Sequence, residues 1–416
     1  MEHREIVVIG AGPAGAVAAT LLRRQGHDVL MLERQLFPRF SIGESLLAHC
    51  LEFIEEAGMM DAVRAGGFQV KNGAAFARGE HYTAFDFREK FTAGPAVTYQ
   101  VQRAQFDKIL ADDAARQGVD VRFQQEVTAF SFDRGRATLA VRDATGEMHA
   151  ITAKHVLDAS GYGRVLARML DLERPSSMPA RKAIFTHIED GIVATDFDRE
   201  KILISVHPDE PGIWYWLIPF SNGRCSIGVV GGEGLFSQAG EDLTITLRNL
   251  VGAAPNLRRL LVNAKWDTPA NTIAGYSASV TRLHGDGFTL LGNAAEFLDP
   301  VFSSGVTIAL CSAKLATDAL MRELNGGTVD WDADFSAPLM AGVETFRTYV
   351  DGWYDGSFQD VVFHPDAQPD VRRMVCSILA GYAWDTTNPY VADSRKRLRT
   401  LATLCAPVRH CDTVTA

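Results

Sequence analysis

Two tryptophans in a short strand-like run are the first side chains that could shape a reaction site. Residues 214–219 read WYWLIP, so Trp214 and Trp216 are two positions apart. Residues with this spacing on a strand point to the same face, and Pro219 ends the strand because it has no N–H to donate. Two rigid rings side by side can fill a sheet core or form the wall of a site. Both interpretations remain open from this run alone.

A lysine and a serine-rich turn add groups for polar and anionic chemistry. Residues 67–74 read GFQVKNGA, and Lys71 in this run is either a surface lysine on a strand or a buried one. Burial would lower its pKa by desolvation. Ser304 and Gly305, in the turn SSG at residues 303–305, can present free backbone N–H groups of a helix start to an anion. A simple helix cap explains the same turn equally well.

The first 33 residues predict a dinucleotide site. Residues 5–9 form a β-branched run typical of a buried parallel strand, and residues 29–32 form a second strand that ends at Glu33. A glycine-rich turn and an alanine-rich helix lie between them. The glycines let the backbone close on a pyrophosphate, and the acid can accept a hydrogen bond from a ribose hydroxyl. The cofactor-binding residues expected here are Gly10, Gly12, Pro13, Ala14, Gly15 and Glu33.

Segments far along the chain contribute to the same expected site, which favours FAD over NAD. Residues 43–45 are expected at a helix start, residues 103–117 form a helix, residues 157–161 end a strand, and residues 290–295 form a second strand-to-helix turn. Each segment alone could be a plain turn or cap. The further cofactor-binding candidates are Arg39, Gly43, Glu44, Ser45, Arg103, Val127, Asp158, Gly161, Gly292, Asn293 and Pro300.

Taken in order, these segments resemble the flavoprotein monooxygenases of the hydroxybenzoate-hydroxylase fold over most of residues 1–330. The resemblance implies an α/β fold in which a Rossmann-like FAD-binding domain (1–165 plus 265–325) carries an inserted β-sheet substrate domain (166–264, with strands from 67–101). A helical C-terminal region (326–416) follows. One departure is Asn293, where the family usually carries Asp, although an amide still accepts and donates hydrogen bonds.

Three motifs narrow the resemblance to the flavin-dependent halogenases. Residues 214–219 match the W-x-W-x-I-P motif of that family, and Lys71 stands where the family keeps its active-site lysine. Residues 298–306, LDPVFSSGV, match its loop and helix start beside the flavin ring, where halide is held. Residues 382–390, YAWDTTNPY, look like the tail of the halogenases that act on phenols and pyrroles.

The resemblance implies a mechanism in three steps. Reduced FAD (FADH2) reacts with O2 to give a C4a-hydroperoxide, and chloride or bromide held near Ser304 and Gly305 attacks its distal oxygen. The resulting hypohalous acid passes along a tunnel to Lys71, which positions it for attack by an electron-rich aromatic carbon. Trp214 and Trp216 would separate the substrate from the hydroperoxide.

The resemblance also bears on substrate and partners. Tryptophan halogenases carry a glutamate three residues before the glycine of the halide loop, where this chain has Phe302. A phenol or pyrrole is activated by its own heteroatom, so the missing acid favours such a substrate over a free indole. Relatives often take the ring tethered to an acidic carrier protein. A basic run near the C-terminus would dock a carrier or form a solvated helix face, and its residues are Arg395, Lys396, Arg397 and Arg399.

Composition limits the remaining partners. A net charge of −10 and a pI of about 5.6 argue against nucleic acid and against an anionic membrane surface. The sequence has no bilayer-length apolar stretch and no signal-peptide architecture at residue 1, so we expect a cytoplasmic protein. The six cysteines lack C-x-x-C spacing, which predicts no metal site. No second G-x-G-x-x-G is evident, so a separate flavin reductase is expected to supply FADH2.

Other activities are compatible with the FAD segments. An FAD-dependent aromatic monooxygenase (hydroxylase) of the same fold is the main alternative, and it has no need of Lys71 or of the paired tryptophans. A reductase of isoprenoid chains would need a long apolar channel and no halide site. A non-catalytic flavin sensor would need neither the apolar channel nor a halide site.

Overall fold

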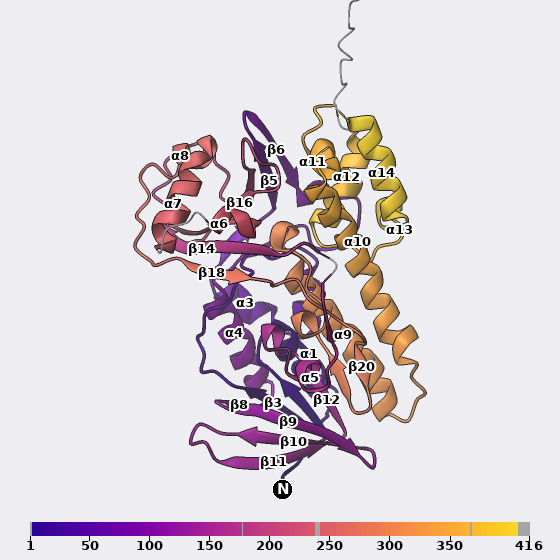
Figure 1. Cartoon of the computed structure of the whole chain (residues 1–416). Coiled ribbons are helices and arrows are strands. Elements are labelled where there is room, and N and C mark those ends of the chain that lie inside the picture. Colours follow the sequence, from indigo (N-terminus) through magenta and orange to yellow (C-terminus); the bar gives the residue numbers. More distant parts are fainter. Residues whose placement is uncertain (1, 177, 238–241, 367, 407–416) are drawn as a thin grey trace, which may run out of the picture.

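A mostly parallel sheet in the lower half of Figure 1 is built from the strands that flank the glycine-rich turn. The computed structural model describes residues 2–176, 178–237, 242–366 and 368–406. Within them, β2 is buried along its whole length and pairs in parallel with β3 and β12, as its unbroken apolar run predicts. The six strands are, in order, β20 (His284–Gly285), β21 (Phe288–Leu290), β12 (His155–Asp158), β2 (Ile6–Ile9), β3 (Val29–Glu33) and β8 (Asp120–Phe123).

Helices with small residues lie close against this sheet. The glycine-rich turn leads from β2 into α1 (Pro13–Arg24), in which every residue from Pro13 to Leu22 is buried. Its alanines allow α1 to pack against both α4 (Arg103–Arg116) and the long α9 (Ser304–Leu324). The strand–turn–helix predicted around the glycines is therefore confirmed. Shorter helices here are α2 (Cys50–Glu56), α3 (Met60–Ala65) and α5 (Val165–Met169).

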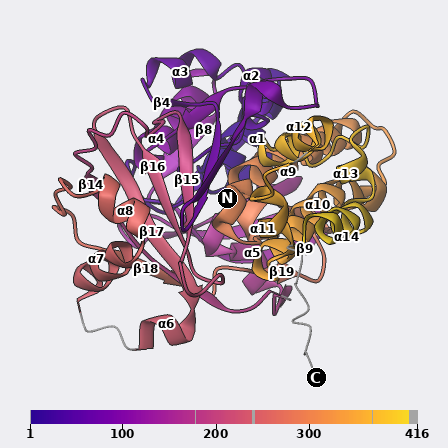
Figure 2. The ribbon, with the colours of Figure 1, turned by 90° about the horizontal axis from the view of Figure 1, so that it is seen from above.

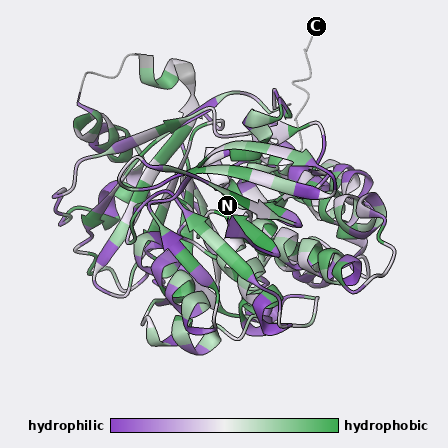
Figure 3. Cartoon of the chain, turned by 90° about the horizontal axis from the view of Figure 1, so that it is seen from below, coloured by the Kyte–Doolittle hydropathy of each residue, from purple (hydrophilic) through white to green (hydrophobic). Residues whose placement is uncertain are grey.

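A second sheet extends the lower layer. Its four strands are β1 (Glu2–His3), β11 (Met148–Ala153), β10 (Arg136–Arg142) and β9 (Glu126–Asp133), in that order across the sheet. Seen from below, the outer positions of the surrounding helices are largely hydrophilic, whereas the strands carry hydrophobic positions toward the interior (Figure 3). No helix in the described ranges is long and apolar enough to cross a membrane.

A larger sheet forms the upper layer and carries both tryptophans (Figures 1 and 2). Within the described chain its strands are, in order, β18 (Asn271–Ala274), β14 (Arg181–Glu189), β17 (Arg224–Gly232), β16 (Trp214–Pro219), β15 (Lys201–Val206), β5 (Gly73–Arg78) and β6 (His81–Asp86). Trp214, Trp216 and Ile218 face the main core, whereas Tyr215 and Leu217 face a second core under α7 (Leu243–Ala253) and α8 (Pro255–Leu260). This alternation confirms that the two tryptophans share a face.

The C-terminal part of the described chain is helical, as predicted, and lies beside both layers (Figure 2). Residues 407–416 of the predicted C-terminal region, including Cys411, are outside the described residues. The boundaries of the three domains remain predictions. The helices are α10 (Ala337–Tyr354), α11 (Ser357–Val362), α12 (Pro369–Leu379), α13 (Pro389–Ala392) and α14 (Ser394–Cys405).

Short elements connect these layers. The two-stranded pairs are β4 (Gln69–Lys71) with β7 (Thr98–Gln100), and β13 (Glu173–Arg174) with β19 (Ser279–Val280). The remaining helix is α6 (Glu233–Ser237), and the short turns are η1 (Phe87–Glu89), η2 (Gly161–Gly163), η3 (Gly292–Ala294), η4 (Pro300–Phe302) and η5 (Asp332–Ser336).

The helix start expected at Gly43 to Ser45 is wrong. This stretch is extended, because Ser45 forms a β-bridge with Gln100 and the carbonyl of Glu44 accepts a hydrogen bond of 2.7 Å from the backbone N–H of Val101. The next helix, α2, begins at Cys50. Pairing with a strand 55 residues downstream therefore overrides the local capping pattern.

The close approach of Trp216 to β17 gives a stability prediction. A Cβ added at Gly228 would lie 2.2 Å from the Trp216 ring, so Gly228→Ala must displace the indole. We expect the free energy of unfolding to fall by about 1–3 kcal/mol in urea titrations. Gly212→Ala is the matched control because a Cβ there meets nothing within 4 Å. Equal stability of the two variants would contradict this account of the packing.

Candidate active site

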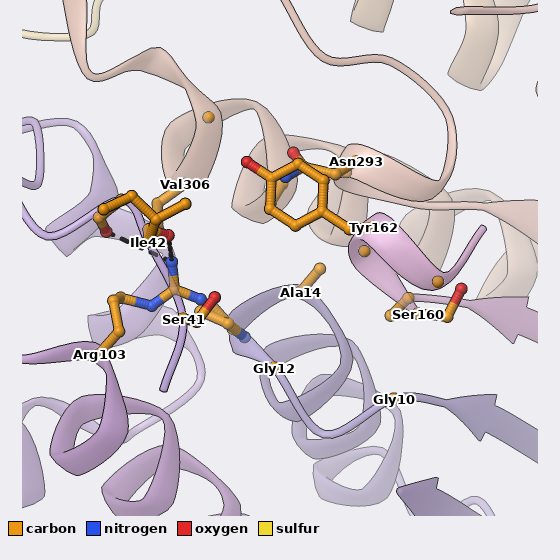
Figure 4. Close-up of a pocket in the computed structure, with 18 of the residues that line it drawn as sticks. Gly10, Gly12, Ala14, Ser41, Ile42, Arg103, Ser160, Tyr162, Asn293 and Val306 are labelled. Carbon is orange, nitrogen blue, oxygen red and sulfur yellow. Dashed lines mark hydrogen bonds between the residues drawn. The ribbon is translucent and has the colours of Figure 1, made fainter. Parts of the chain in front are cut away.

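A single cavity brings most of the predicted cofactor-binding residues together (Figure 4). Its walls come from the glycine-rich turn, the end of β3, the loop at residues 39–45, η2, η3, the start of α9 and strand β16. The predicted residues that line it are Gly10, Gly12, Pro13, Ala14, Glu33, Arg39, Gly43, Glu44, Ser45, Arg103, Val127, Gly161, Gly292, Asn293, Pro300, Gly305, Trp214 and Trp216.

The nucleotide end of the cavity has the features that a pyrophosphate requires. Gly10 has φ of +97°, and a Cβ at this position would lie 2.6 Å from the carbonyl oxygen of Ala159. The backbone therefore passes close to η2 and leads directly into α1, whose first N–H groups are open to an anion. Glu33 accepts hydrogen bonds from the backbone N–H groups of Ala11 and Gln35. These bonds hold its carboxylate at the cavity, with lone pairs left for a ribose hydroxyl.

Arg103 holds the loop that covers the middle of the cavity. Its Nη1 donates to the carbonyl oxygen of Ile42 at 2.7 Å (Figure 4). Its Nε donates to Asp107 at 2.7 Å. Asp107 also pairs with Arg39 at 3.0 Å, so one buried carboxylate orients two arginines. Both guanidinium groups line the cavity and fit the phosphates of an extended dinucleotide.

Four predicted site residues are not in the cavity wall. Gly15 lies in the first turn of α1, where a Cβ would meet the carbonyl oxygen of Gly10, so its role is packing of helix against strand. Asp158 is buried and accepts from the backbone N–H groups of Ser160 and Leu166, so it shapes η2 from behind. Ser304 is 2% exposed at the start of α9, and Lys71 lies in a separate buried position.

Tyr162 is a cavity residue that the sequence did not identify. Its ring and Asn293 both line the cavity (Figure 4), and the ring packs against Phe297, with ring centroids 5.6 Å apart. Burial raises the pKa of its hydroxyl to about 12, so it remains a neutral hydrogen-bonding group at neutral pH. The only sequence pattern near it, a strand end followed by glycines, does not indicate an aromatic wall.

The turn before α9 exposes backbone N–H groups to the cavity. Ser303 has φ of +58°, in the left-handed region that a serine adopts only at a cost of order 1–2 kcal/mol. The carboxylate of Asp299 accepts from the backbone N–H of Val301 at 3.0 Å and holds the preceding turn η4. No side chain of the described residues caps the N–H groups at the start of α9, and Ser303 and Gly305 both line the cavity. This arrangement suits a small anion.

The two tryptophans form one wall of the cavity. Trp214 and Trp216 are 1% and 5% exposed, and their rings are tilted by 48° with centroids 5.9 Å apart. The indole N–H of Trp216 donates to the hydroxyl of Ser226 at 3.0 Å. The indole N–H of Trp214 donates to the hydroxyl of Tyr354, at the end of α10, at 2.9 Å. Each ring is therefore fixed by a polar contact as well as by packing.

Lys71 is buried, and the interpretation as a surface lysine is wrong. Its side chain is 1% exposed, and its Nζ donates to the carbonyl oxygen of Leu46 at 2.8 Å and lies 5.4 Å from the centre of the Phe87 ring. Desolvation lowers its pKa from 10.5 to about 7. A large share of the amine is therefore neutral near neutral pH and has a lone pair available as a nucleophile or hydrogen-bond acceptor.

Buried side-chain oxygens without a hydrogen-bond partner occur on β7, which pairs with the strand of Lys71, and on Ser45 in the cavity wall. Thr98 pairs directly with Lys71 across the two-stranded sheet, so the two side chains share a face. The buried oxygens Thr98 Oγ1, Gln100 Oε1 and Ser45 Oγ have no hydrogen-bond partner among the described residues. Leaving such a group unpaired costs about 1–3 kcal/mol, which favours a polar ligand nearby. Ser45 lines the cavity and bridges to Gln100, so these oxygens follow the backbone from the cavity toward Lys71.

The remaining sequence features have structural roles. Phe302 packs edge-on against Trp353 and Phe358, with ring centroids at 5.7 and 5.4 Å. An apolar cluster therefore occupies the position at which tryptophan halogenases carry a glutamate. In the tail motif, the hydroxyl of Tyr382 donates to the carbonyl oxygen of Pro95 at 2.9 Å. The four basic residues of α14 are exposed, and one of them, Arg395, pairs with Glu344 at 3.1 Å. The described residues contain no cluster suited to a metal ion.

The burial of Lys71 predicts a pH-dependent stability. Its pKa in the folded chain lies below that of an unfolded lysine, so the unfolded chain binds more protons and the stability rises as pH increases from about 7 to 10.5. The full span corresponds to roughly 5 kcal/mol. Lys71→Met removes this titration, so urea unfolding should show the variant more stable than the wild type near pH 7, with the difference shrinking toward pH 10. Lys396→Met, on the exposed face of α14, is the control. A difference that does not change with pH would contradict the desolvation of Lys71.

Comparisons with known proteins agree with this geometry. A family model described as FAD binding domain matches residues 3–333. The chain is 31% identical to a tryptophan 2-halogenase of Chondromyces crocatus over 78% of its own length, although it spans only 62% of that relative. It is 29% identical to a 1H-pyrrole-2-carbonyl-[peptidyl-carrier protein] brominase of Pseudoalteromonas luteoviolacea, with 92% of each chain covered. A crystal structure of a flavoprotein/dehydrogenase from Cytophaga hutchinsonii superposes with a TM-score of 0.94 at 44% identity, over 97% of this chain and 99% of the other.

Proposed function

Because this chain belongs to the FAD-binding domain family and, within it, to the flavin-dependent halogenases, we propose that it installs chlorine or bromine on an electron-rich aromatic carbon. In the net reaction, the aromatic C–H, a halide ion, O2, FADH2 and a proton give the carbon–halogen bond, oxidised FAD and two molecules of water. The aromatic carbon supplies an electron pair to an electrophilic halogen and loses its proton to the medium.

One observation carries this proposal. Lys71 is fully buried, has a pKa near 7 and lies outside the cofactor cavity. The cavity itself contains the turn before α9, whose backbone N–H groups suit an anion, and a wall formed by Trp214 and Trp216. An aromatic hydroxylase transfers oxygen at the flavin and has no use for a remote amine. A halogenase needs such a group to receive a diffusible oxidant. The alternative of an FAD-dependent aromatic monooxygenase is not favoured.

Halide would be oxidised in the flavin cavity, and the halogen would be transferred to the substrate at Lys71. FADH2, when bound along the cavity, would supply two of the four electrons that reduce O2, and the halide would supply the other two, giving hypohalous acid and water. Backbone N–H groups at the start of α9, near Ser304 and Gly305, would hold the halide. Lys71 would accept a hydrogen bond from hypohalous acid, or take the halogen on Nζ with loss of a proton, and would present it to the aromatic ring.

The tryptophan wall would separate the flavin cavity from the substrate position at Lys71. Trp214 and Trp216 line the cavity, and the bulk of two indole rings would prevent an aromatic substrate from reaching the flavin. Hypohalous acid is much smaller and would pass along the polar oxygens of Ser45, Gln100 and Thr98. Separation of this kind protects the substrate from hydroxylation.

We propose a phenol or pyrrole, free or tethered to a carrier protein, as the substrate. The brominase of Pseudoalteromonas luteoviolacea acts on a carrier-bound pyrrole, and it matches this chain over nearly its whole length. The aromatic cluster around Phe302 supports the same choice, because no carboxylate stands there to assist a free indole. A separate flavin reductase would supply FADH2, since the sequence has one glycine-rich dinucleotide fingerprint. A cytoplasmic location remains a prediction.

The function is tested with purified protein, FADH2, O2 and bromide or chloride. Free phenols and pyrroles, and a pyrrole-2-carbonyl group loaded on a carrier protein, are the substrates. We expect a mass increase corresponding to replacement of H by halogen. Lys71→Met should lower this product by at least about 100-fold while FAD affinity stays unchanged, since a group that positions a reactant contributes on this scale.

The control separates chemistry from folding. Lys182→Met changes a partly exposed lysine of β14, and it should halogenate at the wild-type rate. A hydroxylated product from the wild type, with no halogenated one, would overturn the proposal in favour of a monooxygenase. Full halogenation by Lys71→Met would overturn the role of the lysine.

A further inference from the structure

A buried chain of hydrogen bonds runs through Tyr354 of α10 and connects the tryptophan wall to the turn before α9, residues 299–305, which we call the halide turn. The indole N–H of Trp214 donates to the hydroxyl of Tyr354 at 2.9 Å, and that hydroxyl lies 2.9 Å from Oδ2 of Asp299. An indole can only donate and a phenol has one proton, so the direction is fixed: Trp214 donates to Tyr354, and Tyr354 donates to the carboxylate. Trp214 and Asp299 are 1% and 2% exposed.

The three residues come from parts of the chain that are distant in sequence. Trp214 lies on β16, Asp299 caps η4 before α9, and Tyr354 is the last residue of α10. Asp299 accepts through Oδ1 from the backbone N–H of Val301 and so anchors the turn that leads to Ser303. Tyr354 is therefore the one side chain that bridges the wall and the halide turn by hydrogen bonds in the described chain.

Other groups hold Tyr354 in place. The guanidinium of Arg181, from β14, lies 3.4 Å from the centre of the Tyr354 ring, and its Nη1 donates to the carbonyl oxygen of Gly212 at 3.1 Å. The hydroxyl of Tyr276 lies 3.4 Å from the same carboxylate oxygen. The ring is thus stacked on one face, and its hydroxyl makes one hydrogen bond as acceptor and one as donor. Such a group is fixed in position before any ligand arrives.

The two tryptophans differ in what orients them. Trp216 donates to Ser226, which lies on β17 in the same sheet, so its orientation is set by the sheet itself. Trp214 donates to a helix outside the sheet. The position of Trp214 at the cavity wall therefore depends on the placement of α10 and on the protonation state of Asp299.

We propose that Tyr354 is a positioning residue that holds Trp214 across the boundary between the flavin cavity and Lys71, with Asp299 fixing its hydroxyl. This inference rests on the proposed function, because the boundary has a use only if an oxidant must leave the flavin while the substrate stays away. Without the hydroxyl, the indole N–H and the carboxylate both lose a buried partner, and the indole is free to rotate out of the wall. Water would then reach the flavin site, and FADH2 and O2 would end as oxidised FAD and hydrogen peroxide before halide is oxidised, instead of giving halogenated product.

Tyr354→Phe is the variant, and Tyr349→Phe is its matched control. Tyr349 lies in the same helix, is 1% exposed and donates its hydroxyl to the carbonyl oxygen of Tyr390, away from the wall. Both variants lose one buried hydroxyl. We expect Tyr354→Phe to raise the ratio of peroxide to halogenated product about tenfold at unchanged FAD affinity, and Tyr349→Phe to leave that ratio at the wild-type value. Trp214→Phe should raise the ratio similarly, and adding Tyr354→Phe to it should change little more.

A second measurement needs no cofactor. Burial raises the pKa of Asp299 to about 6, and the groups that face its carboxyl are Tyr276, Tyr354, Arg181 and the backbone N–H of Val301. The near-UV circular dichroism of the apoprotein should change around pH 6 as Asp299 loses its proton and reorients Tyr354 and Trp214. Tyr349→Phe should keep this transition, whereas Tyr354→Phe and Trp214→Phe should lack it.

The outcomes separate this inference from the proposed function. A Tyr354→Phe variant that matches Tyr349→Phe in peroxide ratio and in the pH transition overturns the positioning role. A wild-type protein that halogenates no substrate overturns the proposed function, and the pH transition of the apoprotein still decides whether Tyr354 couples Asp299 to Trp214.

Discussion

An ammonium group loses several kcal/mol of hydration when it moves from water into a protein interior, and a single hydrogen bond does not replace what is lost. Lys71 is in this situation, with its Nζ bonded to one backbone carbonyl, that of Leu46. The fold therefore has to supply stability elsewhere, and it maintains a lysine that is partly neutral near pH 7. In the proposed function, the cofactor cavity and the tryptophan wall serve to deliver a halogen to this one buried amine.

The architecture creates the burial by bringing separate segments together. The strand β4 carries Lys71, the extended stretch at residues 43–46 passes beside β7, and Phe87 covers the amine from η1. The glycine-rich sheet holds the nucleotide half of the cavity, while the seven-stranded sheet turns the tryptophans toward the same space. The C-terminal helices complete the wall through Tyr354. Two layers and a helical flank thus define a cofactor cavity and a separate position for the lysine.

Much of this organisation could be predicted from local sequence. The strand, the glycine-rich turn and α1 follow from a β-branched run, three glycines and an alanine-rich stretch, because close backbone approach at Gly10 requires glycine. The shared face of Trp214 and Trp216 follows from the period of two. The order of the family motifs along the chain predicted FAD as the cofactor and halogenation as the reaction.

The rest depends on contacts between segments that no local pattern encodes. The stretch Gly43 to Ser45 looked like a helix start, but its pairing with β7 decided the outcome. Burial of Lys71 depends on Leu46 and Phe87, and the sequence around the lysine favoured the surface. Tyr162 and Tyr354 were not predicted, since an aromatic residue in a helix or turn gives no sign of which cavity its ring will reach. The roles of the site residues remain predictions.

In the proposed mechanism, the halogen leaves the flavin and is held on the Nζ of Lys71 before it meets the substrate. A single-turnover experiment tests this directly: the enzyme reacts with FADH2, O2 and bromide alone, small oxidants are removed by rapid gel filtration, and the aromatic substrate is added only after the flavin has fully reoxidised. We expect brominated product after this delay, in an amount approaching one equivalent of enzyme, and none from Lys71→Met. Product that forms only when the substrate is present during flavin oxidation would contradict it.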